Sequence, residues 1–129
     1  LYIQVLNAKK YQNYLLMGDA GWETEYYILQ DYPHLKVDVL VLGHHGSQHS
    51  SSYAFLEKLQ PEIAIVSAGF NNRYGHPSEI VKARLRELNI PVLSTINDGT
   101  IQFLQHQNND VEINKQRDIR LWLKRGFSD

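Results

Sequence analysis

The sequence predicts a single α/β domain, because short apolar runs with strand character alternate with amphipathic runs with helical character. The chain has 129 residues, 43% of them hydrophobic and 21% charged, and both values are ordinary for one globular domain. Polar, glycine-rich segments follow the strand-like runs. Loops at such positions are where α/β proteins carry their chemistry.

The composition excludes several classes of function. Thirteen basic and 14 acidic residues give a formal net charge of -1, which does not support a purely electrostatic nucleic-acid binder. The chain has no cysteine, so disulfides and thiolate metal sites are excluded and a metal would need His, Asp or Glu. No run approaches the roughly 20 apolar residues of a membrane span. The chain begins with Leu1, which predicts a segment cut from a longer protein.

The first half predicts three strands separated by a turn and a helix. The glycine-containing segment 18–21 ends the second strand, and Pro33 ends the helix. The third strand is rich in valine, as expected of a buried strand. The predicted ranges are strands 1–6 and 14–17 around a turn at Lys9 and Lys10, a helix over 22–30 and a strand over 37–42.

The second half continues the alternation of helix and strand. The clearest helix begins at Pro77, which suits the first helical position, and carries apolar residues at helical spacing. Asn97-Asp98-Gly99 predicts a hairpin turn. The predicted ranges are a polar loop over 43–52, helices over 53–59 and 77–88, strands over 63–67, 91–95 and 100–104, a loop over 68–75, and a tail over 111–123 that fits strand or helix.

Three polar clusters follow predicted strands. In the first, the carboxylate of Asp19 ends a strand between small residues and can bridge two metal ions; it also fits a turn or helix cap. In the second, His44 and His45 stand between glycines. An extended backbone would point them to opposite sides, one toward a metal or phosphate and the other toward a supporting partner. An ordinary polar loop is the alternative.

The third cluster precedes the helix that Pro77 begins. Neutral imidazole is a common zinc ligand, so His76 is a candidate, and Asn72, Arg73 and Tyr74 offer donors for phosphate oxygens. The alternative is a loop in which these side chains cap backbone groups.

Other polar and aromatic residues have plainer interpretations. Residues 50–52 fit a helix cap, and Ser47 lacks the partners of a serine-hydrolase triad. His34, His49 and His106 fit surface histidines. Trp22, Tyr26 and Tyr27 can stack bases, although their helical spacing is more typical of packing.

The clusters in this order resemble the ComEC family of bacterial DNA-uptake proteins. The resemblance rests on LLMGDAGWETEYYIL, VDVLVLGHHGSQHSSS, IAIVSAGFNNRYGHPS and NDGTI, and it runs from about Tyr14 to Leu104. It implies a metallo-β-lactamase-like αββα sandwich with one or two metal ions at one edge. Asp19 matches that superfamily's bridging aspartate. The phosphodiesterase relatives imply His76 as the final ligand, with His44 and His45 contacting phosphate; the glyoxalase-like relatives imply His44 or His45 instead.

The resemblance has one departure, since the superfamily's main ligand motif, HxHxDH, does not occur in this chain. Residues 1–129 are therefore expected to be the C-terminal portion of the sandwich, with an open, mostly metal-free site that binds metal weakly and is inactive in isolation. The full domain would hold zinc or manganese, up to two ions.

The implied function is metal-dependent phosphodiester hydrolysis that degrades the non-transported single strand of DNA during uptake. Asp19 would bridge the metals, His76 would bind one, His44 or His45 would serve the leaving group, and Asn72 and Tyr74 would orient the phosphate. The domain would lie on the extracytoplasmic side of a bacterial inner-membrane protein. The alternatives are a non-catalytic relict binding domain and a hydrolase of small phosphoesters or lactones. Exposed apolar residues in 1–6 further predict self-association.

Overall fold

The computed structural model of the chain describes residues 1–7, 10–106 and 111–116. Within these ranges five strands form one sheet in the order β1-β2-β3-β4-β5, and β6 and β7 form a second sheet of two strands. The first sheet is antiparallel at β1–β2 and parallel at the other three pairs. The elements are β1 (Tyr2–Asn7), β2 (Lys10–Leu16), α1 (Trp22–Asp31), β3 (Val39–Val41), η1 (Gly43–Gly46), α2 (Tyr53–Leu59), β4 (Ile63–Val66), α3 (Glu79–Glu87), β5 (Val92–Ser94), α4 (Thr95–Asp98), β6 (Ile101–Gln105) and β7 (Val111–Lys115).

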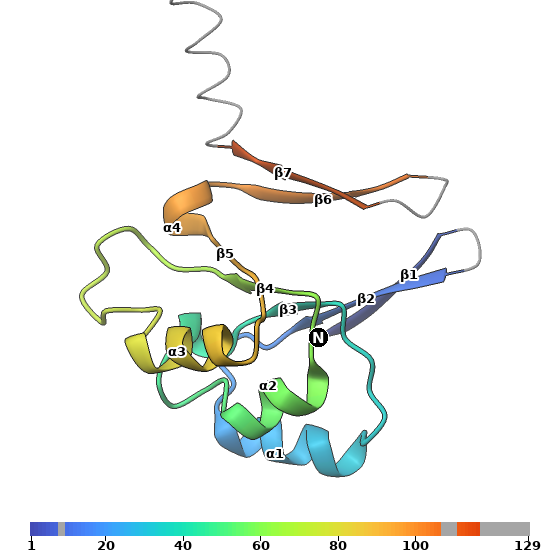
Figure 1. Cartoon of the computed structure of the whole chain (residues 1–129), viewed down its shortest axis with the longest axis horizontal. Coiled ribbons are helices and arrows are strands. Elements are labelled where there is room, and N and C mark those ends of the chain that lie inside the picture. Colours follow the sequence, from blue (N-terminus) through green and yellow to red (C-terminus); the bar gives the residue numbers. More distant parts are fainter. Residues whose placement is uncertain (8–9, 107–110, 117–129) are drawn as a thin grey trace, which may run out of the picture.

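The elements form three layers. Helices α1, α2 and α3 lie on one side of the five-stranded sheet, and β6 and β7 lie on the other (Figure 1). The second sheet contacts the first through Phe103 and Tyr14, whose ring centroids are 5.8 Å apart in an edge-to-face arrangement. Gln105 also donates to the Tyr14 hydroxyl at 3.4 Å. The chain is thus an α/β structure, as the alternation of runs predicts.

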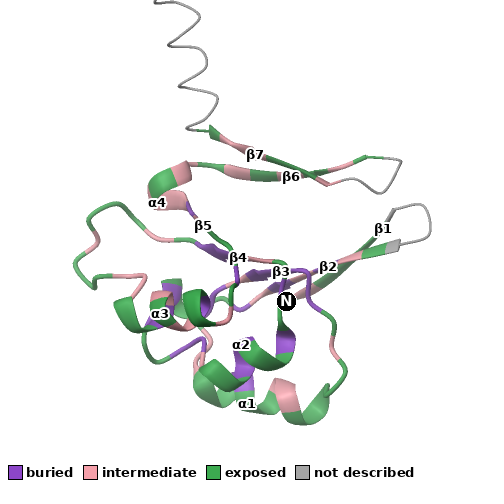
Figure 2. Cartoon of the chain, viewed as in Figure 1, coloured by how far each residue is buried: buried purple, intermediate pink, exposed green. Residues whose placement is uncertain are grey.

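The apolar core lies between the five-stranded sheet and the three helices, where the buried segments face one another (Figure 2). Leu40 and Val66 come from central strands, and Phe55, Leu56 and Leu85 come from α2 and α3; all are buried. Each such side chain stabilises the fold by roughly 1.5–3 kcal/mol relative to an exposed one. This packing holds the helices and the sheet together, and with them the sheet edge at which the loops after β2, β3 and β4 begin.

Most elements lie close to their predicted ranges, but the hairpin predicted at Asn97-Asp98-Gly99 is wrong. Residues 95–98 form the short helix α4, whose N-cap Ser94 accepts from the Ile96 N–H at 3.2 Å. The Asp98 carboxylate accepts from the Ser94 N–H at 3.1 Å. Local side-chain caps therefore favour a helical turn, and β6 pairs with β7 instead of returning along β5.

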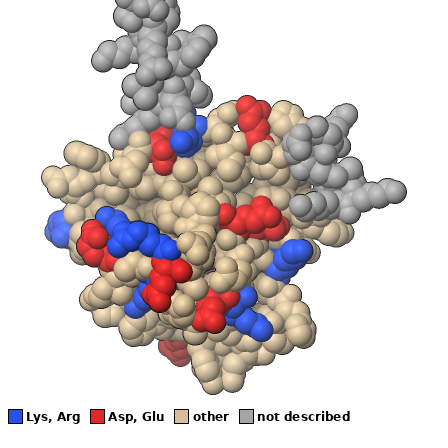
Figure 3. Space-filling view, in the orientation of Figure 1, with Lys and Arg blue, Asp and Glu red and all other residues tan. Residues whose placement is uncertain are grey.

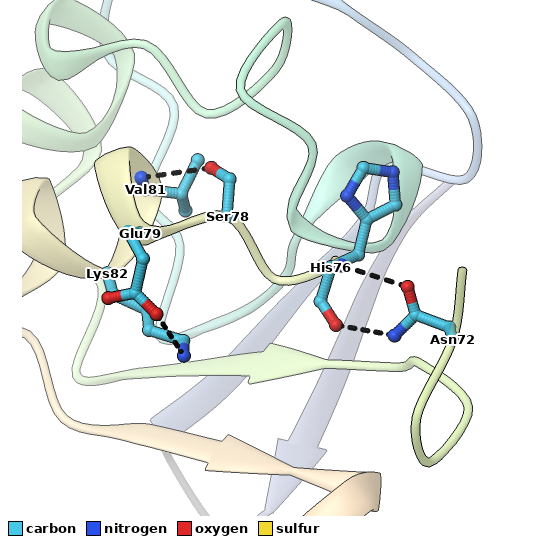
Figure 4. A network of polar contacts seen from close by, with 6 residues as sticks. All are labelled: Asn72, His76, Ser78, Glu79, Val81 and Lys82. Atoms are coloured by element: carbon cyan, nitrogen blue, oxygen red, sulfur yellow. Dashed lines mark hydrogen bonds and ion pairs between the residues drawn. The ribbon is translucent and has the colours of Figure 1, made fainter. Parts of the chain in front are cut away.

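The helix predicted from Pro77 begins two residues later. Ser78 is the N-cap of α3 and accepts from the Val81 N–H at 3.2 Å (Figure 4). Pro77 therefore lies outside the helix, on a cis peptide bond with His76. In the tail, residues 111–115 form β7, and residues 117–123 lie outside the described residues.

The parallel strands β2, β3 and β4 end at the same edge of the sheet, so the loops that follow them are neighbours. Among the described residues, no helix is long and apolar enough to cross a membrane.

Candidate active site at the carboxyl edge of the sheet

The three polar clusters meet at the edge of the sheet where β2, β3 and β4 end, and backbone hydrogen bonds join them. The His44 N–H donates to the Gly18 carbonyl at 2.7 Å, which ties η1 to the loop after β2. The Ser78 N–H donates to the Gly46 carbonyl at 2.9 Å, which ties η1 to the start of α3. Because each cluster follows a strand, we expected Asp19, His76 and at least one of His44 and His45 to converge at one edge of the fold. This expectation is confirmed, since all four residues line one cavity.

The two glycines that flank the histidine pair allow this close approach. A Cβ atom on Gly43 would lie 2.4 Å from the Ala20 carbonyl oxygen, well inside van der Waals contact. Gly46 has a φ of +80°, and a Cβ there would lie 2.7 Å from the Cβ of Pro77. Glycine at both positions therefore lets η1 pack between the other two loops.

His44 and His45 do not have the extended backbone expected of them. Both adopt left-handed conformations, with φ values of 48° and 55°. Such a conformation costs a non-glycine residue roughly 1–3 kcal/mol. Both residues line the same cavity, so the expectation that they lie on opposite sides of an extended backbone is wrong.

One ring nitrogen of His45 is held by a hydrogen bond to the backbone, and the other faces Asp19. Its Nδ1 lies 2.6 Å from the Ser67 carbonyl oxygen, and because a carbonyl only accepts, Nδ1 must carry the hydrogen. In the neutral ring this leaves a lone pair on Nε2, which lies 3.9 Å from Oδ1 of Asp19. Histidines that bind metals are oriented in this way by a backbone carbonyl.

His76 occupies a drier position beside the pair. Its ring stacks on Tyr74 at a centroid distance of 5.7 Å and meets His44 edge-on at 5.7 Å. Burial lowers the pKa of His76 below its ordinary value, and the neighbouring His44 and His45 lower it further. Its Nδ1 is buried and has no hydrogen-bond partner among the described residues. The ring is therefore held in its neutral, proton-accepting form near pH 7.

The amide of Asn72 is used by its own loop. Its Nδ2 donates to the Gly69 carbonyl at 3.0 Å. Nδ2 also donates to the His76 carbonyl at 2.7 Å, and Oδ1 accepts from the His76 N–H at 2.9 Å (Figure 4). Asn72 thus shapes the loop that carries His76. Tyr74 is exposed, and its hydroxyl accepts from Arg73 at 3.0 Å.

The converging side chains line one cavity of about 620 Å³. A smaller cavity of about 290 Å³ adjoins it and shares His45, Tyr74 and His76. His34 and His106 are exposed, as expected; His49 is exposed too but lines the larger cavity. The residues lining the larger cavity are Asp19, His44, His45, Ser47, Gln48, His49, Tyr74, His76 and Ser78.

A buried carboxylate supports the loop behind the site, and sequence reasoning missed it. Glu25 of α1 is 2% exposed and accepts the Ser52 N–H at 2.9 Å and also the Ser51 N–H. Burial raises its pKa, against the opposing effect of these N–H groups and Arg84. Arg84 of α3 donates to the carbonyls of Ser50 and Ser51 at 3.3 and 3.1 Å. The available signal was the position of Glu25 on the same helical face as Ile28 and Leu29.

Residues 50–52 were expected to cap a helix, and Ser52 does so. Ser52 is the N-cap of α2, and its hydroxyl accepts from the Phe55 N–H at 3.3 Å.

Asp19 and His45 fit two positions of a metal site. Two ligand atoms that each lie about 2.1 Å from one ion can be at most about 4.2 Å apart, and the observed 3.9 Å between Oδ1 and Nε2 meets this limit. Among the described residues, no group of three or more His, Asp or Glu side chains is placed to hold an ion. The Asp19–His45 pair is therefore too small by itself to enclose an ion.

The chain is a homologue of a short segment of several bacterial proteins. It is 45% identical over 91 residues to the ComE operon protein 3 of Bacillus subtilis (strain 168), 43% identical over 90 residues to the competence protein ComA of Neisseria gonorrhoeae, and 35% identical over 88 residues to recombination protein 2 of Haemophilus influenzae. These alignments cover 68–70% of this chain and 11–13% of the relatives' lengths. No protein-family model and no solved structure matches the chain.

Proposed function

We propose that this chain belongs to the ComEC family of DNA-uptake proteins and forms part of a metal-dependent phosphodiesterase site that acts on single-stranded DNA. The observation that carries the proposal is the convergence of Asp19 with His44, His45 and His76 in one cavity. Identity of 43% to a protein named for competence supports the biological setting. The order helices, sheet, second sheet suits three layers of an αββα sandwich.

The pair formed by Asp19 and His45 would hold a divalent cation, zinc or manganese. Such an ion, with a second in the complete domain, activates water and stabilises charge on phosphate oxygens. The contacts favour His45 over His76 as the partner of Asp19, because the Ser67 carbonyl directs the free Nε2 of His45 toward that carboxylate. His76 as the ligand, which the family resemblance implies, is the alternative assignment.

The other side chains move protons and bind the substrate. His44 is exposed in the cavity and in edge contact with His76, so it can donate a proton to the leaving oxygen. His76, held neutral, can accept a proton within the same cluster. The exposed Tyr74 hydroxyl can donate to a phosphate oxygen. Asn72 positions His76 by fixing the loop.

The proposed cellular location of the chain rests on its proposed membership of the ComEC family. The relatives are many times longer than the matched segment. We propose that the chain acts within such a protein, on the extracytoplasmic side of a bacterial inner membrane.

One observation favours a second candidate. Asp19 and His45 are paired in the cavity, but no group of three or more His, Asp or Glu side chains in the described residues could hold a metal ion. A relict site that binds DNA without cleaving it would also have this arrangement.

The test is cleavage by the longest protein that carries this segment, with manganese or zinc. The substrates are a labelled single-stranded oligonucleotide, a small phosphodiester and a lactone. The proposal expects the oligonucleotide to be cut, with rates at least about 100-fold lower for Asp19→Asn and His45→Ala. His34→Ala, an exposed histidine that does not line the cavity, is the matched control and should keep its rate. Equal rates for Asp19→Asn and wild type would reject the site, and binding without cleavage would favour the relict.

A further inference from the structure

Two exposed aromatic side chains contact histidines of the cavity from different elements. Trp22, the first residue of α1, is 48% exposed, and its ring meets the His49 ring edge-on at 5.7 Å. The Trp22 N–H also donates to the His49 carbonyl at 3.2 Å. His49 lines the larger cavity, so Trp22 contacts a residue of the cavity wall from α1 without lining the cavity itself.

Tyr74 occupies the rim on the side of the loop between β4 and α3. It is 67% exposed, stacks on His76 with an interplanar angle of 18°, and lines both cavities. Single exposed aromatic residues are common on proteins and require no special reason. Trp22 and Tyr74 differ from isolated exposed aromatic residues because the ring of each contacts the ring of a histidine that lines the cavity.

Arg73 adds a cation beside Tyr74. Its guanidinium carbon lies 5.1 Å from the centre of the Tyr74 ring. No acidic residue of the described ranges forms an ion pair with it, and no lysine or arginine lines the larger cavity itself. On the face shown in Figure 3, basic and acidic side chains are interspersed without a continuous basic patch. Binding of an anionic strand would therefore depend on local contacts such as Arg73.

We propose that Trp22 and Tyr74 are nucleobase-stacking residues that hold the nucleotides flanking the reacting phosphate, and that Arg73 contacts a flanking phosphate. The proposal rests on the phosphodiesterase function proposed for the same cavity. Stacking on a protein side chain needs an open base face, which single strands offer and duplexes hide. The arrangement thus selects single-stranded nucleic acid over duplexes and over small esters.

The test measures binding of a fluorescein-labelled thymidine octanucleotide to the full chain by anisotropy, in EDTA so that no cleavage occurs. Trp22→Ala and Tyr74→Ala should each weaken binding by about 5- to 150-fold, while Trp22→Phe, which keeps a ring, should retain most of it. Arg73→Gln should weaken binding and reduce the slope of log K against log salt by about 0.7. Tyr32→Ala and Lys58→Gln are matched controls, since both residues are exposed and neither lines a described cavity.

Three results would overturn the inference: no binding by the wild-type chain, equal binding of a duplex of the same length, or unchanged binding by Trp22→Ala and Tyr74→Ala. Hydrolysis of a small phosphodiester by the longer protein is measured separately. If that hydrolysis occurs while the aromatic variants bind normally, only the stacking proposal fails. If the aromatic variants lose binding while nothing is hydrolysed, the stacking proposal stands and the phosphodiesterase proposal fails.

Discussion

The histidines of the cavity differ in how their ring nitrogens are used. His45 has its Nδ1 fixed by a carbonyl and its Nε2 free beside Asp19. His76 is packed against Tyr74 and His44, and its pKa is lowered mainly by burial. His44 is exposed. Three chemically identical side chains therefore have three different environments. The proposed function assigns them the roles of ligand, proton acceptor and proton donor.

The lowered pKa of His76 predicts a pH-dependent stability. Because the folded chain holds this ring with a pKa below 6.5, the unfolded chain binds the proton first as the pH falls. The stability that the neutral His76 ring contributes to the folded state is fully present above about pH 6.5. It is lost as the pH falls toward the pKa of His76 in the folded chain. Thermal unfolding at pH 7.5 and 5.5 should show a larger loss of Tm for wild type than for His76→Gln. Equal losses in the two proteins would contradict this assignment.

The loop that carries His76 should depend on Asn72. Asn72→Ala removes three hydrogen bonds to Gly69 and His76 and should lower the free energy of unfolding by about 1–3 kcal/mol. Asn71→Gly is the control, because Asn71 has a φ of 53° that glycine adopts without strain. Denaturant titration of both variants is the measurement, and a loss as large for Asn71→Gly would argue against a specific role for the Asn72 amide.

The sequence was informative about site residues that lie in the loops after parallel strands. Asp19, His44 and His45 come shortly after β2 and β3, and His76 lies in the longer loop between β4 and α3. These residues could be predicted to converge, because parallel strands bring their carboxyl ends to one edge. Other features depend on tertiary packing. The left-handed turn at His44 and His45, the Ser67 carbonyl behind His45 and the buried Glu25 arise from contacts between distant segments. A local pattern carries no direct record of such contacts.

At the scale of elements, the positions of α1, α2 and the central strands followed from apolar runs and the residues that interrupt them, and α3 followed from helical spacing. The exact ends and the connections did not. Asn97-Asp98-Gly99 fits a hairpin turn locally, but caps by Ser94 and Asp98 favour α4. Pro77 fits the first turn of a helix, but Ser78 caps α3 instead. In both cases a side-chain hydrogen bond decided between two local structures of similar propensity.

The packing of η1 against the loop after β2 predicts the effect of one added methyl group. Gly43→Ala places a Cβ 2.4 Å from the Ala20 carbonyl and should lower the free energy of unfolding by about 1–3 kcal/mol. It should also separate His45 from Asp19. Gly69→Ala is the matched control, since a Cβ there meets nothing within 4 Å and the change should stay within about 0.5 kcal/mol. Equal stability of the two variants, measured by urea unfolding, would show that η1 can shift to accommodate the added methyl group.

For the whole molecule, the free edge of the five-stranded sheet is the feature with the widest consequence. β1 is the terminal strand of that sheet, and its residues Ile3, Val5 and Leu6 are exposed, as is Leu1 just before it. Ile3 is paired with Tyr14, so it shares the face on which β6 contacts β2. An exposed apolar edge strand is prone to pair with another copy.

Sedimentation at several concentrations should therefore show self-association of the wild-type chain. Val5→Lys, which places a charge on the edge strand, should shift the chain toward monomer without loss of Tm beyond a few degrees. The prediction would be wrong if the wild-type mass stayed that of a monomer at every concentration.

The proposed function depends on Asp19 and His45 forming a cation site within the cavity. The most direct measurement is paramagnetic broadening of backbone amide signals as manganese is titrated into the ¹⁵N-labelled chain. We predict saturable broadening centred on residues 18–20, 44–46 and 67, which Asp19→Asn abolishes and His34→Ala leaves unchanged. Broadening centred elsewhere, or none localised to this cavity at millimolar manganese, would contradict the account.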